Sequence, residues 1–136
     1  MLSSISPLYA FIEKSAKGHL GGLIIGWKKS SIRCTNTWGS TLGLGTQICW
    51  AEANLTLTIL NIYGMYSNRV DFWDSFKNSR MSKEENLIIG GDLNFTLGAN
   101  ESWGPKERMN PLAPYFSNLL MELELIDLDT QNLKPT

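Results

Sequence analysis

The chain has few cysteines, no strong charge of either sign and no long apolar segment, and each shortage excludes a class of protein. Cys34 and Cys49 are the two cysteines among 136 residues. They are too few for a disulfide framework, and no metal-ligand spacing surrounds them. Lys and Arg number 12 against 13 Asp and Glu, for a formal net charge of -1. A chain so balanced has little non-specific attraction for phosphate.

Segments for targeting and for membrane insertion are also lacking. No apolar run is long enough to cross a bilayer, and residues 1–14 lack the basic and apolar regions of a signal peptide. We therefore expect a soluble, intracellular protein of the nucleus or cytoplasm, with no membrane partner and no obligate protein partner. The Asn-x-Ser/Thr triplets at Asn54, Asn94 and Asn100 are then expected to be fortuitous. His19 is the single histidine, and its context favours a loop residue over a catalytic one.

The chain does have enough apolar residues, 43% of the total, for the core of one domain. Helical spacing of apolar residues predicts helices over 70–81 and 111–123, and Asn68 is expected to cap the first of them. Because these helices separate strands, the pattern favours a layered α+β or α/β domain with helices packed on a sheet. Apolar and β-branched runs predict the strands, at 19–27, 31–38, 46–53, 54–63 and 87–89, with 125–128 as a further candidate.

The most informative stretch is NLIIGGDLNFTL, residues 86–97. Its apolar run is closed by Gly90 and Gly91, which we expect to end the strand. Asp92 and Asn94 follow, and if the extended backbone continues through Leu93, both side chains leave on the same side of the chain. Asp92 could then accept the proton of a water molecule while Asn94 holds the oxygen or the substrate. The alternative is an Asx turn that does no chemistry.

Tyr63 is the candidate partner of this pair. It ends the predicted strand 54–63, beside Gly64 and just before the first predicted helix. Two neighbouring parallel strands joined through that helix would have both ends on one edge of the sheet, where ligands collect in open α/β sheets. We therefore expect Tyr63 to lie near Asp92 and Asn94. The alternative is an ordinary half-buried tyrosine.

Several segments of the chain together carry a resemblance to a known family. In order, GGLIIGW, LTILNIYG, the helix with FWDSF, LIIGGDLN and YFSNLLMELELIDL resemble the endonuclease/exonuclease/phosphatase family. They are most similar to the apurinic-endonuclease-like domain of plant LINE-type retrotransposons. The resemblance covers residues 19–136 as a partial domain, after a poorly defined segment 1–18. It implies a DNase I-like, four-layered α/β sandwich with two β-sheets inside and helices outside.

The resemblance also implies a reaction and the residues that perform it. The family contains Mg²⁺-dependent phosphodiesterases, and its LINE-type members nick DNA by in-line attack of an activated water. Asp92 matches the aspartate that activates the water, and Asn94 matches the asparagine that positions water and phosphate. Tyr63 matches the tyrosine that touches the scissile phosphate. Thr136 falls where the family has a substrate-binding threonine.

The chain departs from the family pattern at several positions. Met65 stands where the family has a proline, and Glu13 is in the wrong context to be the metal-binding glutamate. The family's closing Asp/His segment would follow Thr136. With its Mg²⁺ ligand set incomplete, the chain is expected to be an endonuclease fragment without activity on its own. The alternatives are a non-catalytic transposon-derived remnant and a nucleic-acid-binding module without hydrolysis, although the near-neutral charge disfavours such a module.

Overall fold

The computed structural model describes residues 7–16, 21–98, 101 and 110–128. The chain divides into two compact units, Met1–Leu93 and Asn94–Thr136. Among the described residues it is an α+β protein with two sheets and two α-helices. Both sheets and the first helix belong to the first unit. Its strands are β1 (Tyr9–Lys14), β2 (Leu23–Lys28), β3 (Ile32–Gly39), β4 (Gly43–Trp50), β5 (Leu55–Tyr63) and β6 (Leu87–Asp92).

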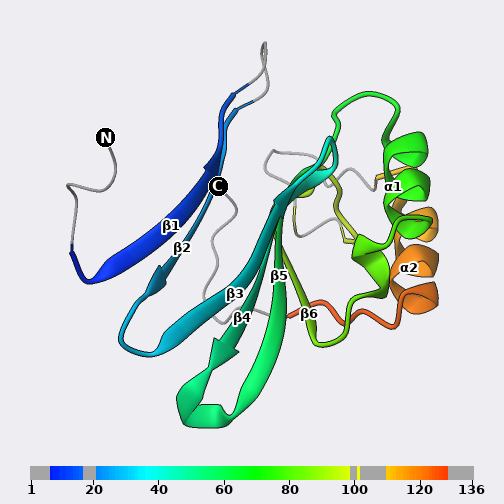
Figure 1. Ribbon diagram of the computed structural model, residues 1–136. Coiled ribbons are helices and arrows are strands. Elements are labelled where there is room, and N and C mark those ends of the chain that lie inside the picture. Colours follow the sequence, from blue (N-terminus) through cyan, green and yellow to red (C-terminus); the bar gives the residue numbers. More distant parts are fainter. Residues whose placement is uncertain (1–6, 17–20, 99–100, 102–109, 129–136) are drawn as a thin grey trace. The chain divides into compact units, whose positions relative to one another are not determined.

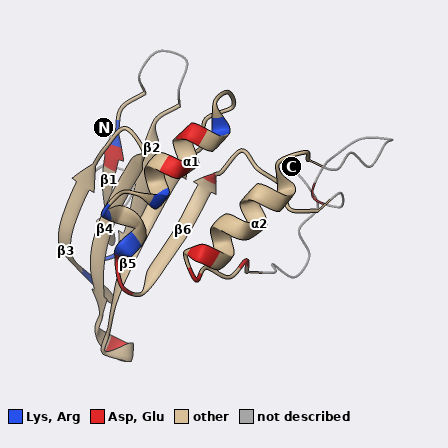
Figure 2. Ribbon diagram, turned by 90° about the vertical axis from the view of Figure 1, so that its right-hand side faces the viewer, with Lys and Arg blue, Asp and Glu red and all other residues tan. Residues whose placement is uncertain are grey.

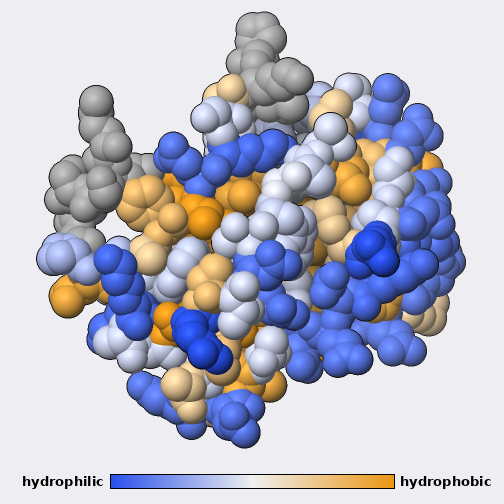
Figure 3. All heavy atoms as spheres, in the orientation of Figure 1, coloured by the Kyte–Doolittle hydropathy of each residue, from blue (hydrophilic) through white to orange (hydrophobic). Residues whose placement is uncertain are grey.

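The smaller sheet consists of β1 and β2, which pair antiparallel with Ile12 opposite Ile25. Alternation along β2 buries Leu23 and Ile25 and leaves Ile24 exposed. The sequence pattern did not predict β1, because its first residues, YAFI, are apolar without the alternation of a half-buried strand. Of the strand expected at 19–27, the described part begins at Leu23. Tyr9 and Ile24 of this sheet are 52% and 51% exposed. Other hydrophobic atoms also reach the face of the molecule drawn in Figure 3.

The larger sheet has the strand order β3-β4-β5-β6, in which β5 and β6 run parallel and the other neighbours antiparallel (Figure 1). Its strands confirm the predictions for 31–38, 46–53 and 54–63 to within a few residues. The expectation that Gly90 and Gly91 end the last strand is wrong. Pairing with β5 continues through both glycines, so β6 reaches Asp92.

The two sheets of the first unit face each other (Figure 1). Leu23 and Ile25 of the smaller sheet form a buried cluster with Leu44 of the larger one. A polar contact joins the sheets as well, because Asn61 Nδ2 donates to the carbonyl oxygen of Ile24 at 2.9 Å. Sheet-on-sheet packing therefore supplies one layer of the core. The residues that pack around the cluster are Ile12, Trp27, Ile59 and Tyr63.

The other face of the larger sheet is covered by helix α1 (Arg69–Lys77) (Figures 1 and 2). Trp73 and Phe76 are its buried residues, with their rings edge to face at 5.5 Å. The helix predicted over 70–81 is thus confirmed, although it ends earlier. Asn68 is the N-cap residue of this helix, as predicted, and its carbonyl accepts from the Phe72 amide at 3.1 Å. Its side chain makes no capping hydrogen bond, however, and its backbone is left-handed (φ 53). Its side chain instead makes that conformation tolerable, as asparagine commonly does.

The second unit contains helix α2 (Ala113–Glu122), which confirms the helix predicted over 111–123. Phe116 is fully buried and stacks on Phe95 at 4.3 Å between ring centroids. The strand expected at 125–128 does not form. Glu124 adopts a left-handed backbone (φ 54), and the Leu125 amide donates back to the Leu120 carbonyl at 2.9 Å, which closes the helix in a Schellman turn. No helix in the described ranges is both long and apolar enough to span a bilayer.

Candidate functional site

Tyr63 and Asp92 lie side by side at the carboxyl ends of β5 and β6. They are paired residues in the parallel register of these strands. Paired residues of neighbouring strands point their side chains to the same face of a sheet. The ladder extends one step further, because the Gly64 amide donates to the Asp92 carbonyl at 2.6 Å. The prediction that Tyr63 and Asp92 share one edge of the sheet is confirmed.

Two glycines allow the ends of β5 and β6 to approach this closely. A Cβ atom added to Gly64 would overlap the carbonyl of Leu93. At Gly91 it would overlap the Ile62 carbonyl and lie 2.6 Å from Asn61 Oδ1, and the backbone there has φ +118, a value that side chains rarely allow. Gly64 of LNIYG and Gly91, the second glycine of IIGGD, are therefore needed for the geometry of the candidate site.

The two side chains of this pair differ in their surroundings. Tyr63 is half-buried and packs against the cluster of Leu23, Ile25 and Leu44. Asp92 is exposed, so its carboxylate is accessible to water and to a ligand. A ring fixed on a core cluster beside an accessible carboxylate can position a substrate and accept a proton. The packing of Tyr63 is also what an ordinary half-buried tyrosine would show.

Strand pairing does not place the other two predicted site residues, Asn94 and Thr136, beside Tyr63 and Asp92. Asn94 is the first residue of the second unit, and its φ of 53 is left-handed. The extended backbone of β6 therefore does not continue to Asn94, and strand alternation does not set the direction of its side chain. Thr136 lies outside the described residues, as does His19.

Asn61 is a residue of this region whose role the sequence did not reveal. It lies two positions before Tyr63, so both side chains leave the same face of β5. Its Nδ2 donates to the Ile24 carbonyl, and its Oδ1 lies beside the space that a side chain on Gly91 would fill. Asn61 thereby links β2 to the ends of β5 and β6. The feature of the sequence that could have drawn attention to Asn61 is a single amide side chain within the apolar run LTILNIY.

A lysine lies at the same end of the sheets. Gly43 pairs with Ile62, so the turn between β3 and β4 lies beside the carboxyl end of β5. Lys14, the last residue of β1, donates from Nζ to the Ser40 carbonyl in that turn. The Ser40 hydroxyl in turn accepts from the Leu42 amide at 3.1 Å. The turn thus holds a positive charge near the edge that carries Tyr63 and Asp92.

The Mg²⁺ ion that the family resemblance implies is not matched by the ligands described. Within residues 7–16, 21–98, 101 and 110–128, no three side chains of His, Cys, Asp or Glu are grouped so that they could hold a metal ion. Mg²⁺ requires near-octahedral oxygen coordination. The single exposed carboxylate of Asp92 does not meet that requirement, so these residues do not fit the ion.

Comparison with models of known protein families and with curated proteins found no match. The candidate site is therefore defined by the pairing of Tyr63 with Asp92, by the two glycines that allow it, and by the nearby Asn61 and Lys14.

Proposed function

We propose that the edge carrying Tyr63 and Asp92 binds the scissile phosphodiester and the attacking water of a DNA-nicking phosphodiesterase. The proposed domain is of the endonuclease/exonuclease/phosphatase type found in LINE-type retrotransposons. The observation that carries the proposal is the register of β5 and β6, in which Tyr63 is the partner of Asp92 at the carboxyl ends of two parallel strands. That edge is where open α/β sheets bind ligands.

The layering of the first unit supports the same proposal. Two sheets face each other, and α1 covers the outer face of the larger one (Figure 1). This is the order of layers on one side of a DNase I-like sandwich. We propose the four-layered form of that sandwich as the architecture of the whole domain, with the candidate site at one end of its two sheets.

The chemistry assigned to each side chain follows from its type. The Asp92 carboxylate takes a proton from water as the water oxygen attacks phosphorus. The Tyr63 hydroxyl donates to a non-bridging phosphate oxygen, where negative charge develops. The bond from phosphorus to the leaving oxygen breaks, and that oxygen takes its proton from solvent. The amide of Asn94 orients the water in this proposal, a role that comes from the family resemblance.

An activated diester tests the proposal directly. Bis(p-nitrophenyl) phosphate releases a stable phenolate that needs no proton from the protein, so it reports on water activation and phosphate binding alone. With its Mg²⁺ ligand set incomplete, the chain alone is not expected to nick DNA, whose leaving group is poor. The activated diester requires only Asp92 and Tyr63, so we expect the full chain to hydrolyse it slowly in buffers with and without Mg²⁺. Asp92→Asn should lower the rate by about 100-fold, the usual contribution of a general base. Tyr63→Phe should lower it by about ten-fold, as expected for one lost hydrogen bond to a charged group.

The matched control is Asp71→Asn, which makes the same change at an exposed aspartate on α1. Its rate should equal that of the unmodified chain. Hydrolysis that is absent, or equal in Asp92→Asn and Asp71→Asn, overturns the proposal. DNA binding without any Asp92-dependent hydrolysis would instead identify a nucleic-acid-binding module.

A further inference from the structure

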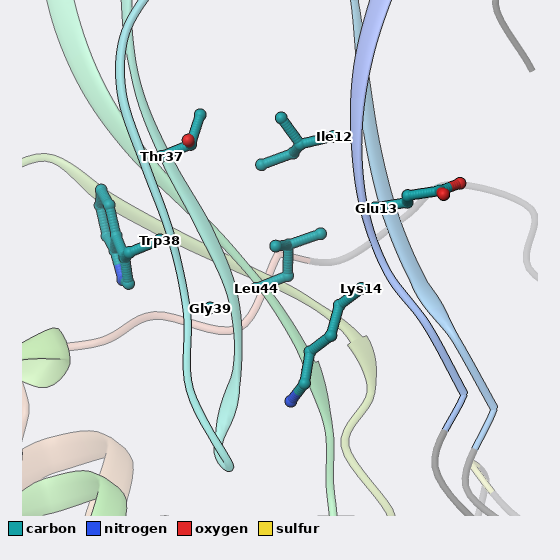
Figure 4. Close-up of a pocket in the computed structure, with 7 residues that line it drawn as sticks. All are labelled: Ile12, Glu13, Lys14, Thr37, Trp38, Gly39 and Leu44. Atoms are coloured by element: carbon teal, nitrogen blue, oxygen red, sulfur yellow. The ribbon is translucent and has the colours of Figure 1, made fainter.

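A pocket of about 380 Å³ lies between β1 and the hairpin of β3 and β4 (Figure 4). Its volume is within the range of pockets that hold small molecules. Three residues of β1 and four of the hairpin line it: Ile12, Glu13, Lys14, Thr37, Trp38, Gly39 and Leu44. The pocket lies wholly within the first unit, at the end of β1 that is nearest to the β3–β4 turn.

Two charged residues line this pocket, Glu13 and Lys14, and their side chains point in different directions (Figure 4). Alternation along β1 places Ile12 and Lys14 on the face toward the larger sheet and Glu13 on the opposite face. Figure 4 shows the Glu13 carboxylate directed away from the hairpin. The Trp38 ring also leaves the pocket, because it lies over Gly45, where a Cβ atom would collide with it. Ile12 is half-buried and Leu44 is only 4% exposed, so Ile12 provides the accessible apolar surface, with the Lys14 ammonium at one end.

Lys14 is held in place by a partner that carries no charge. Its contact with the Ser40 carbonyl fixes the position of Nζ at the β3–β4 turn. A carbonyl is neutral, and an ammonium group has further N–H donors to offer. A fixed ammonium beside an apolar surface can bind an anionic group that is attached to an apolar body.

The position of the pocket relates it to the proposed site. The β3–β4 turn lies beside the carboxyl end of β5, since Gly43 pairs with Ile62, the neighbour of Tyr63. A DNA strand held at Tyr63 and Asp92 would therefore have its adjacent nucleotides within reach of Lys14. Phosphate contacts of this kind position a strand without reading its sequence.

We infer that this pocket binds one nucleotide of the DNA strand next to the scissile phosphate. The phosphate of that nucleotide contacts Lys14 Nζ, the sugar and base lie against Ile12, and the Thr37 hydroxyl is available to the sugar. The identity of the strand rests on the proposed function. The binding of a nucleotide by the pocket can be measured independently of it.

Thymidine 5′-monophosphate and thymidine are the probes for a calorimetric titration of the full chain. Lys14→Met removes the charge and keeps most of the apolar stem. We expect it to weaken binding of the monophosphate by about ten-fold or more, the cost of one charge-assisted hydrogen bond, and to leave thymidine binding unchanged. For a short single-stranded oligonucleotide, the slope of log affinity against log salt should fall by about 1.

Lys28→Met is the matched control. Lys28 lies at the opposite end of the same two-stranded sheet and is exposed, so the change in net charge is identical. Its affinity for the monophosphate should stay within about two-fold of the unmodified value, as for a distant screened charge. Lys14→Arg keeps the charge and should retain binding. A thermal melt of each variant separates loss of the ligand site from loss of the fold.

Equal monophosphate affinities for Lys14→Met and Lys28→Met, with both variants folded, overturn the inference. The two proposals can fail separately. Hydrolysis that depends on Asp92, together with unchanged nucleotide binding in Lys14→Met, refutes the pocket alone. Nucleotide binding that depends on Lys14, without hydrolysis that depends on Asp92, refutes the phosphodiesterase and leaves a nucleotide pocket.

Discussion

The two ends of the β5–β6 pair are built in different ways. At the amino end, asparagines close the turns: Asn54 and Asn86 adopt left-handed backbones with φ 48 and 49, and Asn86 Nδ2 donates to the Thr56 carbonyl at 3.1 Å. At the carboxyl end the close approach depends on Gly64 and Gly91. The amino end is thus secured by two asparagine turns and by one side-chain hydrogen bond between the strands. The carboxyl end is secured by backbone proximity, which leaves an exposed carboxylate beside a fixed tyrosine.

This difference separates the structural residues of the pair from its candidate functional residues. If it holds, variants at the glycines and at Asn86 change stability, whereas a variant at Asp92 changes chemistry with little effect on stability. Substitutions at the two ends test this separation, beginning with the largest expected effect.

The largest effect is expected at Gly91. Gly91→Ala should destabilise the fold by at least about 3 kcal/mol, because a strained backbone of this kind costs about 1–3 kcal/mol and overlap with the Ile62 carbonyl adds to it. Gly90→Ala is the control, since nothing lies within 4 Å of a Cβ atom at that position. Its stability should change by less than about 1 kcal/mol. Urea denaturation measures both, and equal losses would contradict the role assigned to Gly91.

The link between the sheets predicts the next effect. Asn61→Leu keeps nearly the same shape but removes the donor to the Ile24 carbonyl, and it should cost about 1–2 kcal/mol. Asn61→Asp also lacks the donor and should lose at least as much. Hydrogen exchange should accelerate in β2 in both variants. Unchanged stability of Asn61→Leu would show that apolar packing alone holds the sheets together.

Part of this arrangement was predictable from the sequence. Alternation in LTLTILNIY and the apolar run before GGD define β5 and β6, and the helical spacing between them predicts the crossover that makes them parallel. From these features alone, Tyr63 could be placed beside Asp92. These features could be recognised in the sequence because each depends on residues close together in the chain: the alternation of a strand, the spacing of a helix, or the residue at which an element ends.

The rest depends on contacts between distant residues. Strand β1 is defined by its pairing with β2, since the order of apolar residues in YAFIEK does not favour one face. Gly90 and Gly91 resemble a strand terminus until the proximity of the Ile62 carbonyl is known. The contact from Asn61 to Ile24 joins positions 37 residues apart, and the Lys14 contact likewise requires the sheets to be assembled. The residue types of Gly91, Asn61 and Lys14 drew attention to these positions, but the sequence did not show which distant residues they contact.

At the amino end, the effect of Asn86 should be smaller than that of the glycines. Asn86→Ala places an alanine in a left-handed backbone, which asparagine tolerates better, and it removes the hydrogen bond to the Thr56 carbonyl. We expect it to lower the free energy of unfolding by about 1–2 kcal/mol. Asn86→Gly accepts the backbone freely and should cost less. Hydrolysis of the activated diester by both variants should equal that of the unmodified chain. A loss of hydrolysis without a loss of stability would place Asn86 in the functional site and break the comparison.

The smallest change in stability is expected where the largest change in chemistry is expected. Asp92 is exposed at the end of β6, and substitutions at exposed positions usually change stability by less than about 0.5 kcal/mol. Asp92→Asn keeps the shape and the backbone pairing with Tyr63, so its urea midpoint should match that of the unmodified chain while hydrolysis of the activated diester falls. Destabilisation comparable to that of Asn61→Leu would mean that the carboxylate is a structural ligand of the strand end. The separation between backbone and chemistry at the carboxyl end would then fail, and with it the main reason for assigning the proton transfer to Asp92.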